Sequence, residues 1–204
     1  MFIIKAIIFG IVEGITEWLP ISSTGHLILL NEFIKVDVSK EFYSMFEVVI
    51  QLGAIIAVVI LFWNKIWPLY KEKDKVKINK DIISLWGKII VAYVPAAIIG
   101  LLFDEVFEKL FYNPVSVTAA LIVFGILFIV IENKNKKAKV NSLTEITYNT
   151  ALLIGLFQLI AAIFPGTSRS GATIVGALMI GVSRMVAAEF TFFLAIPVMF
   201  GASL

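Results

Sequence analysis

The chain has 204 residues, of which 60% are hydrophobic and only 16% are charged, and its mean hydropathy is +0.98. A soluble domain of this length cannot bury so much apolar surface, so the composition predicts a protein whose solvent is lipid. The net charge of +2 is too small to indicate nucleic-acid binding, and the absence of cysteine excludes disulfides, thiolate metal sites and a cysteine nucleophile.

The first apolar stretch covers about residues 1 to 34 and is interrupted by Pro20-Ile21-Ser22-Ser23-Thr24-Gly25-His26. A cluster of proline, glycine and hydroxyl residues does not continue an ordinary spanning helix. Irregular backbone at membrane depth is tolerated only where protein or a wet cavity satisfies its polar groups. This interruption therefore predicts a helix–loop–helix hairpin that lines a polar cavity.

Three uninterrupted apolar stretches follow, at about 42 to 62, 82 to 103 and 114 to 131, and each is predicted to span the membrane as a helix. The connecting segments 64–81 and 132–147 carry six and four lysines, whereas segment 104–113 carries one lysine and three acidic residues. Because cytoplasmic loops are rich in lysine and arginine, the first two segments are predicted to lie inside and the third outside.

A second broken stretch covers about residues 148 to 184, with the interruption Pro165-Gly166-Thr167-Ser168-Arg169-Ser170-Gly171, and a last predicted span covers 186 to 204. Following the chain from the lysine-rich segments places both ends of the first hairpin outside and both ends of the second inside. The two hairpins are therefore expected to re-enter the membrane from opposite faces.

The two halves of the chain resemble each other. Aligning the prolines of the two breaks pairs Gly10 with Gly155, Glu13 with Gln158, and Ile21-Ser22-Ser23 with Gly166-Thr167-Ser168. Similar halves of opposite orientation are typical of inverted-topology repeats, whose broken helices build a ligand site near the bilayer midplane. We predict an all-α, polytopic membrane helical bundle that forms one domain over residues 1–204, with repeats over about 1–103 and 114–204.

Glu13 and Glu17 precede the first break at positions i and i+4, so on a helix they share one face. Ionised carboxylates inside a membrane segment are costly and usually mark a functional cavity. The alternative is a helix end at the interface, with two solvated acids. Paired carboxylates without a nearby lysine favour a divalent cation, and oxygen ligands in a chain with one histidine and no cysteine indicate Mg²⁺ or Ca²⁺ rather than zinc.

Beyond this carboxylate pair, the first break contains four residues with hydroxyl or imidazole groups: Ser22, Ser23, Thr24 and His26. A lone histidine is more often a structural hydrogen-bonding group than a catalyst. Beside carboxylates, however, a serine or histidine can act as a nucleophile while the other group manages the proton. The residues leave the attacking group open among Ser22, Ser23 and His26. Ser23 is preferred because the hydroxyl cluster lies at the expected hairpin tip, which leaves His26 as acid or base.

Arg169 lies in the second break among Ser168, Ser170 and Thr173, at the start of a predicted helix. A helix N-terminus beside a fork-shaped guanidinium suits a phosphate group. The alternative is an arginine that snorkels to the cytoplasmic interface, as Arg184 is expected to do. The serine- and glycine-rich setting favours the phosphate interpretation.

Two motifs, EGITEWLPISSTGH at residues 13–26 and PGTSRSGAT at residues 165–173, closely resemble the signature motifs of the bacterial undecaprenyl-diphosphate phosphatase family, also called the bacitracin-resistance family. The resemblance continues through residues 46–53 and 188–197 and so covers essentially the whole chain. The family usually continues for further membrane helices beyond the apolar segment in which this chain ends, so the second repeat is expected to be truncated.

The resemblance implies hydrolysis of undecaprenyl diphosphate to undecaprenyl phosphate and inorganic phosphate, which recycles the lipid carrier of peptidoglycan and other cell-wall polymers. It implies a bacterial cell-membrane protein whose site opens to the outer face. The expected partners are a polyprenyl diphosphate lipid and membrane lipid, not nucleic acid. A homo-oligomer is compatible with the resemblance. We expect Glu13 and Glu17 to hold the cation, and Ser23, His26, Glu17 and Arg169 to be catalytic. The expected substrate-binding residues are Ser22, Thr24, Ser168, Arg169, Ser170 and Thr173.

Other functions use some of the same features. A secondary transporter also has inverted repeats, broken helices and a midplane anion site, but it does not need paired carboxylates beside a serine and a histidine. A flippase for the lipid carrier could coexist with hydrolysis in one protein. A purely structural membrane protein would leave the buried polar clusters unexplained.

Overall fold

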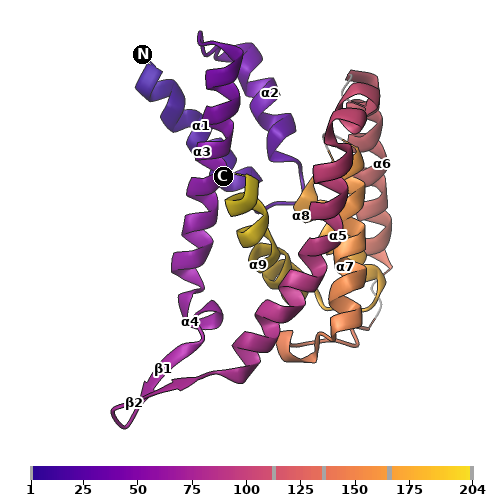
Figure 1. The fold of residues 1–204 in the computed structure, drawn as a ribbon. Helices are drawn as coiled ribbons and strands as arrows, with labels where there is room; N and C mark the ends of the chain where they lie inside the picture. The colour runs from indigo at the N-terminus through magenta and orange to yellow at the C-terminus, as the bar shows by residue number, and fades with distance from the viewer. Residues whose placement is uncertain (1, 112–113, 135–136, 165–166, 203–204) are drawn as a thin grey trace.

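The computed structural model describes residues 2–111, 114–134, 137–164 and 167–202. Helices dominate these residues, as the composition predicts (Figure 1). The longer helices are α1 (Phe2–Thr16), α2 (Ser23–Phe33), α3 (Lys40–Leu61), α5 (Lys80–Phe111), α6 (Pro114–Asn133), α7 (Tyr148–Ile163), α8 (Arg169–Met179) and α9 (Arg184–Ala202). Shorter elements connect them: α4 (Trp63–Ile66), β1 (Leu69–Glu72), β2 (Lys75–Ile78) and the 3-10 helix η1 (Leu143–Glu145).

The two strands are a correction to the all-α prediction. β1 and β2 pair in antiparallel register from Leu69 opposite Ile78 to Glu72 opposite Lys75. The turn residues Lys73 and Asp74 both have positive φ angles, of 47° and 61°, which suits a two-residue hairpin turn. Both strands are exposed along their whole length, so the segment has no buried apolar face that would have signalled a sheet in the sequence.

Three described helical segments are long and apolar enough to cross a membrane: Lys40–Leu61, Lys80–Phe103 and Arg184–Gly201. They match the predicted spans 42–62, 82–103 and 186–204, the last of which ends at residues 203–204, outside the described part of the chain. The predicted span 114–131 corresponds to the 20-residue helix α6, in which Thr118–Asn133 is an apolar helical segment.

The acidic segment after the second span is a further correction. It was expected as an external loop over 104–113, yet α5 continues through it to Phe111. Its leucine, glutamate, lysine and phenylalanine residues all continue a helix, and it holds no glycine or proline that would stop one before Pro114.

The two predicted helix breaks are present. α1 ends at Thr16 and α2 begins at Ser23, whereas α7 ends at Ile163 and α8 begins at Arg169. Pro20 cannot donate a backbone hydrogen bond, so it interrupts the first helix. Pro165 and Gly166 of the second break lie outside the described residues.

Contacts at the base of α5 place both lysine-rich segments at one end of the molecule, which we call the lysine-rich end. Trp86 Nε1 donates to the Ile66 carbonyl of α4 at 2.7 Å, and Lys88 Nζ donates to the Thr144 carbonyl of η1 at 3.4 Å. Figure 1 shows β1, β2 and the start of α7 at this lower end of the view. The two segments therefore lie on the same side, as their charge predicts.

Each broken pair of helices doubles back on itself. In the first hairpin, Lys5 of α1 donates to the Lys35 carbonyl just after α2, at the end opposite the lysine-rich one. In the second, α7 starts next to η1, and the Gly181 carbonyl after α8 accepts from the backbone N–H of Lys139 at 2.7 Å. The hairpins thus start from opposite ends of the molecule, and their tips meet between those ends, where Ser170 Oγ donates to the Glu17 carbonyl at 3.3 Å.

The core lies where α5, α7 and α9 pack together, around Ile89, Ile154, Phe190 and Phe193, all of which have no exposed surface. Gly155 lets α7 lie directly against α5, because a Cβ at this position would clash with the backbone of Ala92. Small residues at helix contacts are the usual means of close packing in membranes, where the hydrophobic effect does not drive helices together. This tightly packed half of the molecule carries α8 and so positions the second break.

Candidate active site

Ser22 shapes the start of α2. Its side-chain oxygen accepts a hydrogen bond from the Gly25 N–H at 3.3 Å, and its φ angle of 64° is unusual for a residue with a side chain. Strained backbone at the entrance of a helix is often found at functional sites, where surrounding contacts maintain it. The turn places Ser23, the first residue of α2, toward the end of α1.

Ser23 and Glu17 form the shortest contact of the site. Ser23 Oγ donates to Glu17 Oε2 at 2.5 Å, and both residues are buried. A short hydroxyl–carboxylate hydrogen bond is charge-assisted, so it is stronger than a neutral one. The pair has the geometry of a nucleophilic hydroxyl with its proton acceptor.

Glu13 lies on α1, one turn before Glu17. Glu17 directly follows the end of this helix, and its N–H donates to the Glu13 carbonyl at 2.9 Å. It has no exposed surface, Glu17 is only 9% exposed, and neither carboxylate oxygen of Glu13 has a hydrogen-bond partner among the described residues. This burial contradicts the alternative of two solvated acids at a helix end. A buried carboxylate without a partner is costly, so this position suits either a neutral carboxyl group or a carboxylate that binds a cation.

The start of α8 mirrors the start of α2. Ser168 caps the helix by accepting from the Gly171 N–H at 3.1 Å, and its Oγ lies 3.0 Å from Ser170 Oγ. Ser170 also reaches the carbonyls of Glu17 at 3.3 Å and Leu19 at 3.5 Å. The second hairpin is thereby fixed onto the first.

Arg169, the first residue of α8, extends toward the first hairpin. Its Nη2 lies 3.7 Å from Glu17 Oε1 and 3.1 Å from the sulfur of Met199 on α9. The guanidinium thus reaches into the molecule and lies beside Glu17. At 3.7 Å the ion pair is too long for a hydrogen bond, so most of the donors of Arg169 remain available to a ligand.

A small polar pocket of about 30 Å³ joins the two breaks. It is lined by Glu17, Ser22, Ser23, Thr24, Thr167, Ser168, Arg169 and Ser170. Helices α2 and α8 both begin at this pocket, and the N-terminus of each carries partial positive charge that favours an anion. The structure therefore brings seven of the predicted site residues together in one cavity, although that cavity is only about the size of a single water molecule.

Thr173 lies one turn further along α8, in a neighbouring cavity of about 20 Å³ that it shares with Glu17, Gln158 and Arg169. Its hydroxyl donates to the Arg169 carbonyl at 3.0 Å and accepts from Thr191 Oγ1 at 3.0 Å. These contacts support the backbone of Arg169.

His26 lies on α2 one turn beyond the pocket and does not line it. Its Nδ1 is 2.8 Å from the Ser22 carbonyl, and because a carbonyl only accepts, Nδ1 carries the proton. Nε2 of a neutral ring is then a free acceptor. In this structure His26 stabilises the turn at Ser22, which is the structural role that a lone histidine most often has.

Three polar residues of the site were not predicted: Thr167, Gln158 and Thr191. All three are buried, and Thr167 Oγ1 has no described hydrogen-bond partner. Thr167 lies within the second motif, and Gln158 is the aligned counterpart of Glu13, so both had a signal in the sequence. Thr191 is a single hydroxyl in an apolar helix and had none.

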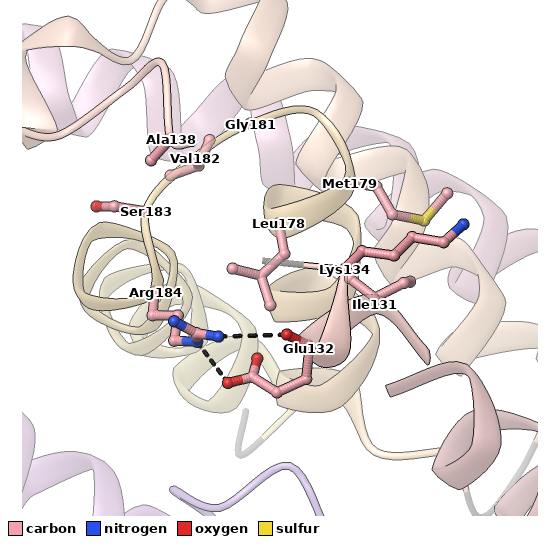
Figure 2. Close-up of a pocket in the computed structure, with 10 residues that line it drawn as sticks. All are labelled: Ile131, Glu132, Lys134, Ala138, Leu178, Met179, Gly181, Val182, Ser183 and Arg184. Atoms are coloured by element: carbon pink, nitrogen blue, oxygen red, sulfur yellow. Dashed lines mark hydrogen bonds and ion pairs between the residues drawn. The ribbon is translucent and has the colours of Figure 1, made fainter. Parts of the chain in front are cut away.

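A larger cavity of about 340 Å³ lies at the far end of α8, where α9 begins (Figure 2). Arg184 there forms an ion pair with the carboxylate of Glu132 on α6 and donates to its carbonyl at 3.4 Å. Arg184 thus lies at the lysine-rich end, and its location at the cytoplasmic interface stays a prediction. None of the predicted catalytic or substrate-binding residues lines this cavity.

The described fold and site define a polytopic membrane protein with a buried polar pocket suited to an anion. Comparison with known proteins is more specific: the chain belongs to the family described as bacitracin resistance protein BacA, whose model matches residues 6–204.

Curated relatives cover almost all of this chain. It is 66% identical to the undecaprenyl-diphosphatase of Desulfitobacterium hafniense over 203 residues, which are 98% of this chain and 73% of that protein. It is 63% identical to undecaprenyl-diphosphatase 1 of Clostridium acetobutylicum, over 99% of this chain and 74% of the relative. The undecaprenyl-diphosphatase of Enterococcus faecalis is 60% identical over 98% of this chain and 74% of its own length.

Proposed function

We propose that this protein hydrolyses undecaprenyl diphosphate to undecaprenyl phosphate and inorganic phosphate, and so recycles the lipid carrier of cell-wall polymers. The observation that carries the proposal is the meeting of Ser23, Glu17 and Arg169 at two helix N-termini. This set supplies a nucleophile, a proton acceptor and a phosphate-binding cation. Relatives that bear the name undecaprenyl-diphosphatase support the choice of substrate.

In the proposed reaction, Ser23 Oγ attacks the terminal phosphorus of the diphosphate. The bond between that phosphorus and the bridging oxygen breaks, undecaprenyl phosphate leaves, and Glu17 Oε2 takes the hydroxyl proton. Water then hydrolyses the phosphoserine to release inorganic phosphate and restore Ser23. Arg169 stabilises the charge on the phosphate oxygens with a bidentate fork, which is the main expected source of rate.

The charge balance of the site favours a divalent cation. With both carboxyl groups ionised, Glu13 and Glu17 would carry two negative charges against one positive charge from Arg169, and a diphosphate would meet net repulsion. The unpartnered, buried oxygens of Glu13 fit a cation ligand. No group of three histidine or acidic side chains suited to a metal exists among the described residues. The proposed Mg²⁺ or Ca²⁺ would therefore be held by one or two carboxylates and by substrate phosphates. Such an ion would neutralise phosphate charge.

We also propose the membrane arrangement. The hairpin of α1 and α2 enters from the outer face of the bacterial cell membrane, and that of α7 and α8 enters from the cytoplasmic face, as an inverted repeat whose site opens outward. Their starting points at opposite ends of the molecule and the lysine-rich end support this orientation.

Transport or flipping of an anionic lipid is the second candidate, because the opposed hairpins also suit a carrier. Phosphate release by the purified protein in detergent micelles separates the two, since micelles have no compartments. We expect release of one phosphate per undecaprenyl diphosphate, with undecaprenyl phosphate as the other product. A protein that releases no phosphate above the background of its Glu17→Ala variant, but moves lipid between the leaflets of vesicles, would be a carrier.

A further inference from the structure

We propose that an apolar cavity between α6 and α8 binds the isoprene units next to the diphosphate of the lipid substrate. This inference rests on the proposed function and gives that function its binding site for the chain. The cavity has a volume of about 230 Å³. Its apolar wall consists of Leu121, Phe124, Gly125 and Phe128 of α6 and Val175 of α8.

The cavity adjoins the polar pocket. Ser22, Thr167 and Ser168 line both, so these three residues form the boundary between a polar chamber and an apolar one. A molecule that joins a phosphate group to a hydrocarbon chain needs such a boundary at the bond between its two parts. A free phosphate needs only the polar pocket, and an ordinary lipid tail needs only the apolar cavity.

Thr167 marks the junction. Its side-chain oxygen is buried and has no described partner, although it lies beside both chambers. An unpaired buried hydroxyl is costly, and a ligand oxygen at the boundary would satisfy it. We assign this hydroxyl to the phosphate oxygen that carries the isoprenoid chain.

The cavity also has room and an entrance. No described heavy atom lies within 4 Å of a Cβ built on Gly125, so the wall of α6 leaves open space at this point. Ile21 and Leu121 at the rim are 43% and 38% exposed, which places the entrance on a surface that faces lipid in a membrane. The rest of the isoprenoid chain therefore leaves the cavity laterally, between the first break and α6, and remains in the bilayer.

The first test maps the chain directly and does not depend on turnover. A diphosphate with a short isoprenoid chain and a photoreactive group on its first units is cross-linked to the purified protein, and the labelled peptides are identified. We expect the label on residues 121–128, with competition by undecaprenyl phosphate. Gly125→Leu fills the open space and should abolish this label. Gly100→Leu on α5 is the matched control, because a Cβ there also meets no described atom and Gly100 lines none of the cavities described above.

Kinetics provide the second test. Gly125→Leu should raise the KM for farnesyl and undecaprenyl diphosphates about tenfold or more, as expected when a hydrophobic pocket loses room for part of its ligand. Its kcat should change little, and a methyl diphosphate should be hydrolysed as by the wild type. Thr167→Val should lower kcat/KM for all three. Labelling of other helices in place of α6, or equal effects of Gly125→Leu and Gly100→Leu, would overturn the assignment. A wild type that is labelled on α6 but releases no phosphate would contradict the proposed function and leave the chain site standing.

Discussion

Ser22 and Ser168 occupy the same structural position in the two halves of the chain. Each precedes the helix after a break, and each side-chain oxygen accepts from the backbone N–H of the glycine three residues later. The sequence alignment on the two prolines pairs Ser22 with Thr167. The structural correspondence of Ser22 with Ser168 is therefore shifted by one residue relative to that alignment. Ser23 then corresponds to Arg169, and these two helix-starting residues both contact Glu17.

Ser23→Ala should reduce kcat by about a thousandfold or more, because no neighbouring group can replace a nucleophile. Ser39→Ala is the matched control and should keep the activity, since Ser39 caps α3 and lines none of the cavities described above. His26→Ala should also leave measurable turnover. Trapping with substrate labelled in the terminal phosphate should give a phosphorylated wild-type enzyme and none with Ser23→Ala. Normal kcat in Ser23→Ala together with an inactive His26→Ala would make His26 the attacking group.

Arg169→Lys should lower kcat/KM by about a hundredfold, because lysine keeps the charge but loses the bidentate fork. Arg169→Ala should be worse still. Thermal unfolding in detergent checks that both variants remain folded. Equal activity of Arg169→Lys and the wild type would show that charge alone is sufficient at this position.

Glu17→Ala should remove most activity, and an excess of chelator should do the same to the wild type. Glu13→Gln should be milder, because an amide oxygen can still coordinate a cation and Gln158 is its counterpart in the second half. The cation that restores the activity of chelator-treated enzyme, Mg²⁺ or Ca²⁺, identifies the ion. Full turnover in excess chelator would exclude the metal role.

Orientation can be measured with single cysteines, since the chain has none of its own. Asp74→Cys in the exposed turn between β1 and β2 should react with a membrane-impermeant reagent only from the cytoplasmic side. Asp37→Cys, between α2 and α3 at the opposite end, should react only from outside. The reverse pattern would invert the membrane arrangement and with it the outward-opening site.

Gly155→Ala should lower the melting temperature, because its methyl group would clash with the backbone of Ala92 where α5 and α7 touch. We expect a loss of about 1–3 kcal/mol in the free energy of unfolding, the usual cost of overpacking. Gly10→Ala is the control from the first half, where a Cβ meets no described atom within 4 Å. Its melting temperature should stay unchanged or rise, since alanine favours a helix.

The positions of the breaks and spans followed from composition, because proline, glycine and long apolar runs act locally. The meeting of Glu17, Ser23 and Arg169 could be predicted too, because polar residues inside a membrane segment usually face a shared cavity, whereas their roles in the reaction stay predictions. The hydrogen bond between Ser23 and Glu17 could not be foreseen, because it depends on the strained turn at Ser22. The wall formed by α6 was equally hidden, since Leu121 and Phe124 look like any lipid-facing residues until α8 is placed beside them.

The hydrogen bond from Ser170 to the Glu17 carbonyl joins segments 153 positions apart in the chain. During biosynthesis the first hairpin is complete long before the ribosome reaches Arg169. Until then the carboxylates of Glu13 and Glu17 lie in a membrane segment without their arginine, which is an expensive state for a nascent chain. We therefore expect this hairpin to insert late, or to be sheltered during insertion, until α8 supplies its contacts.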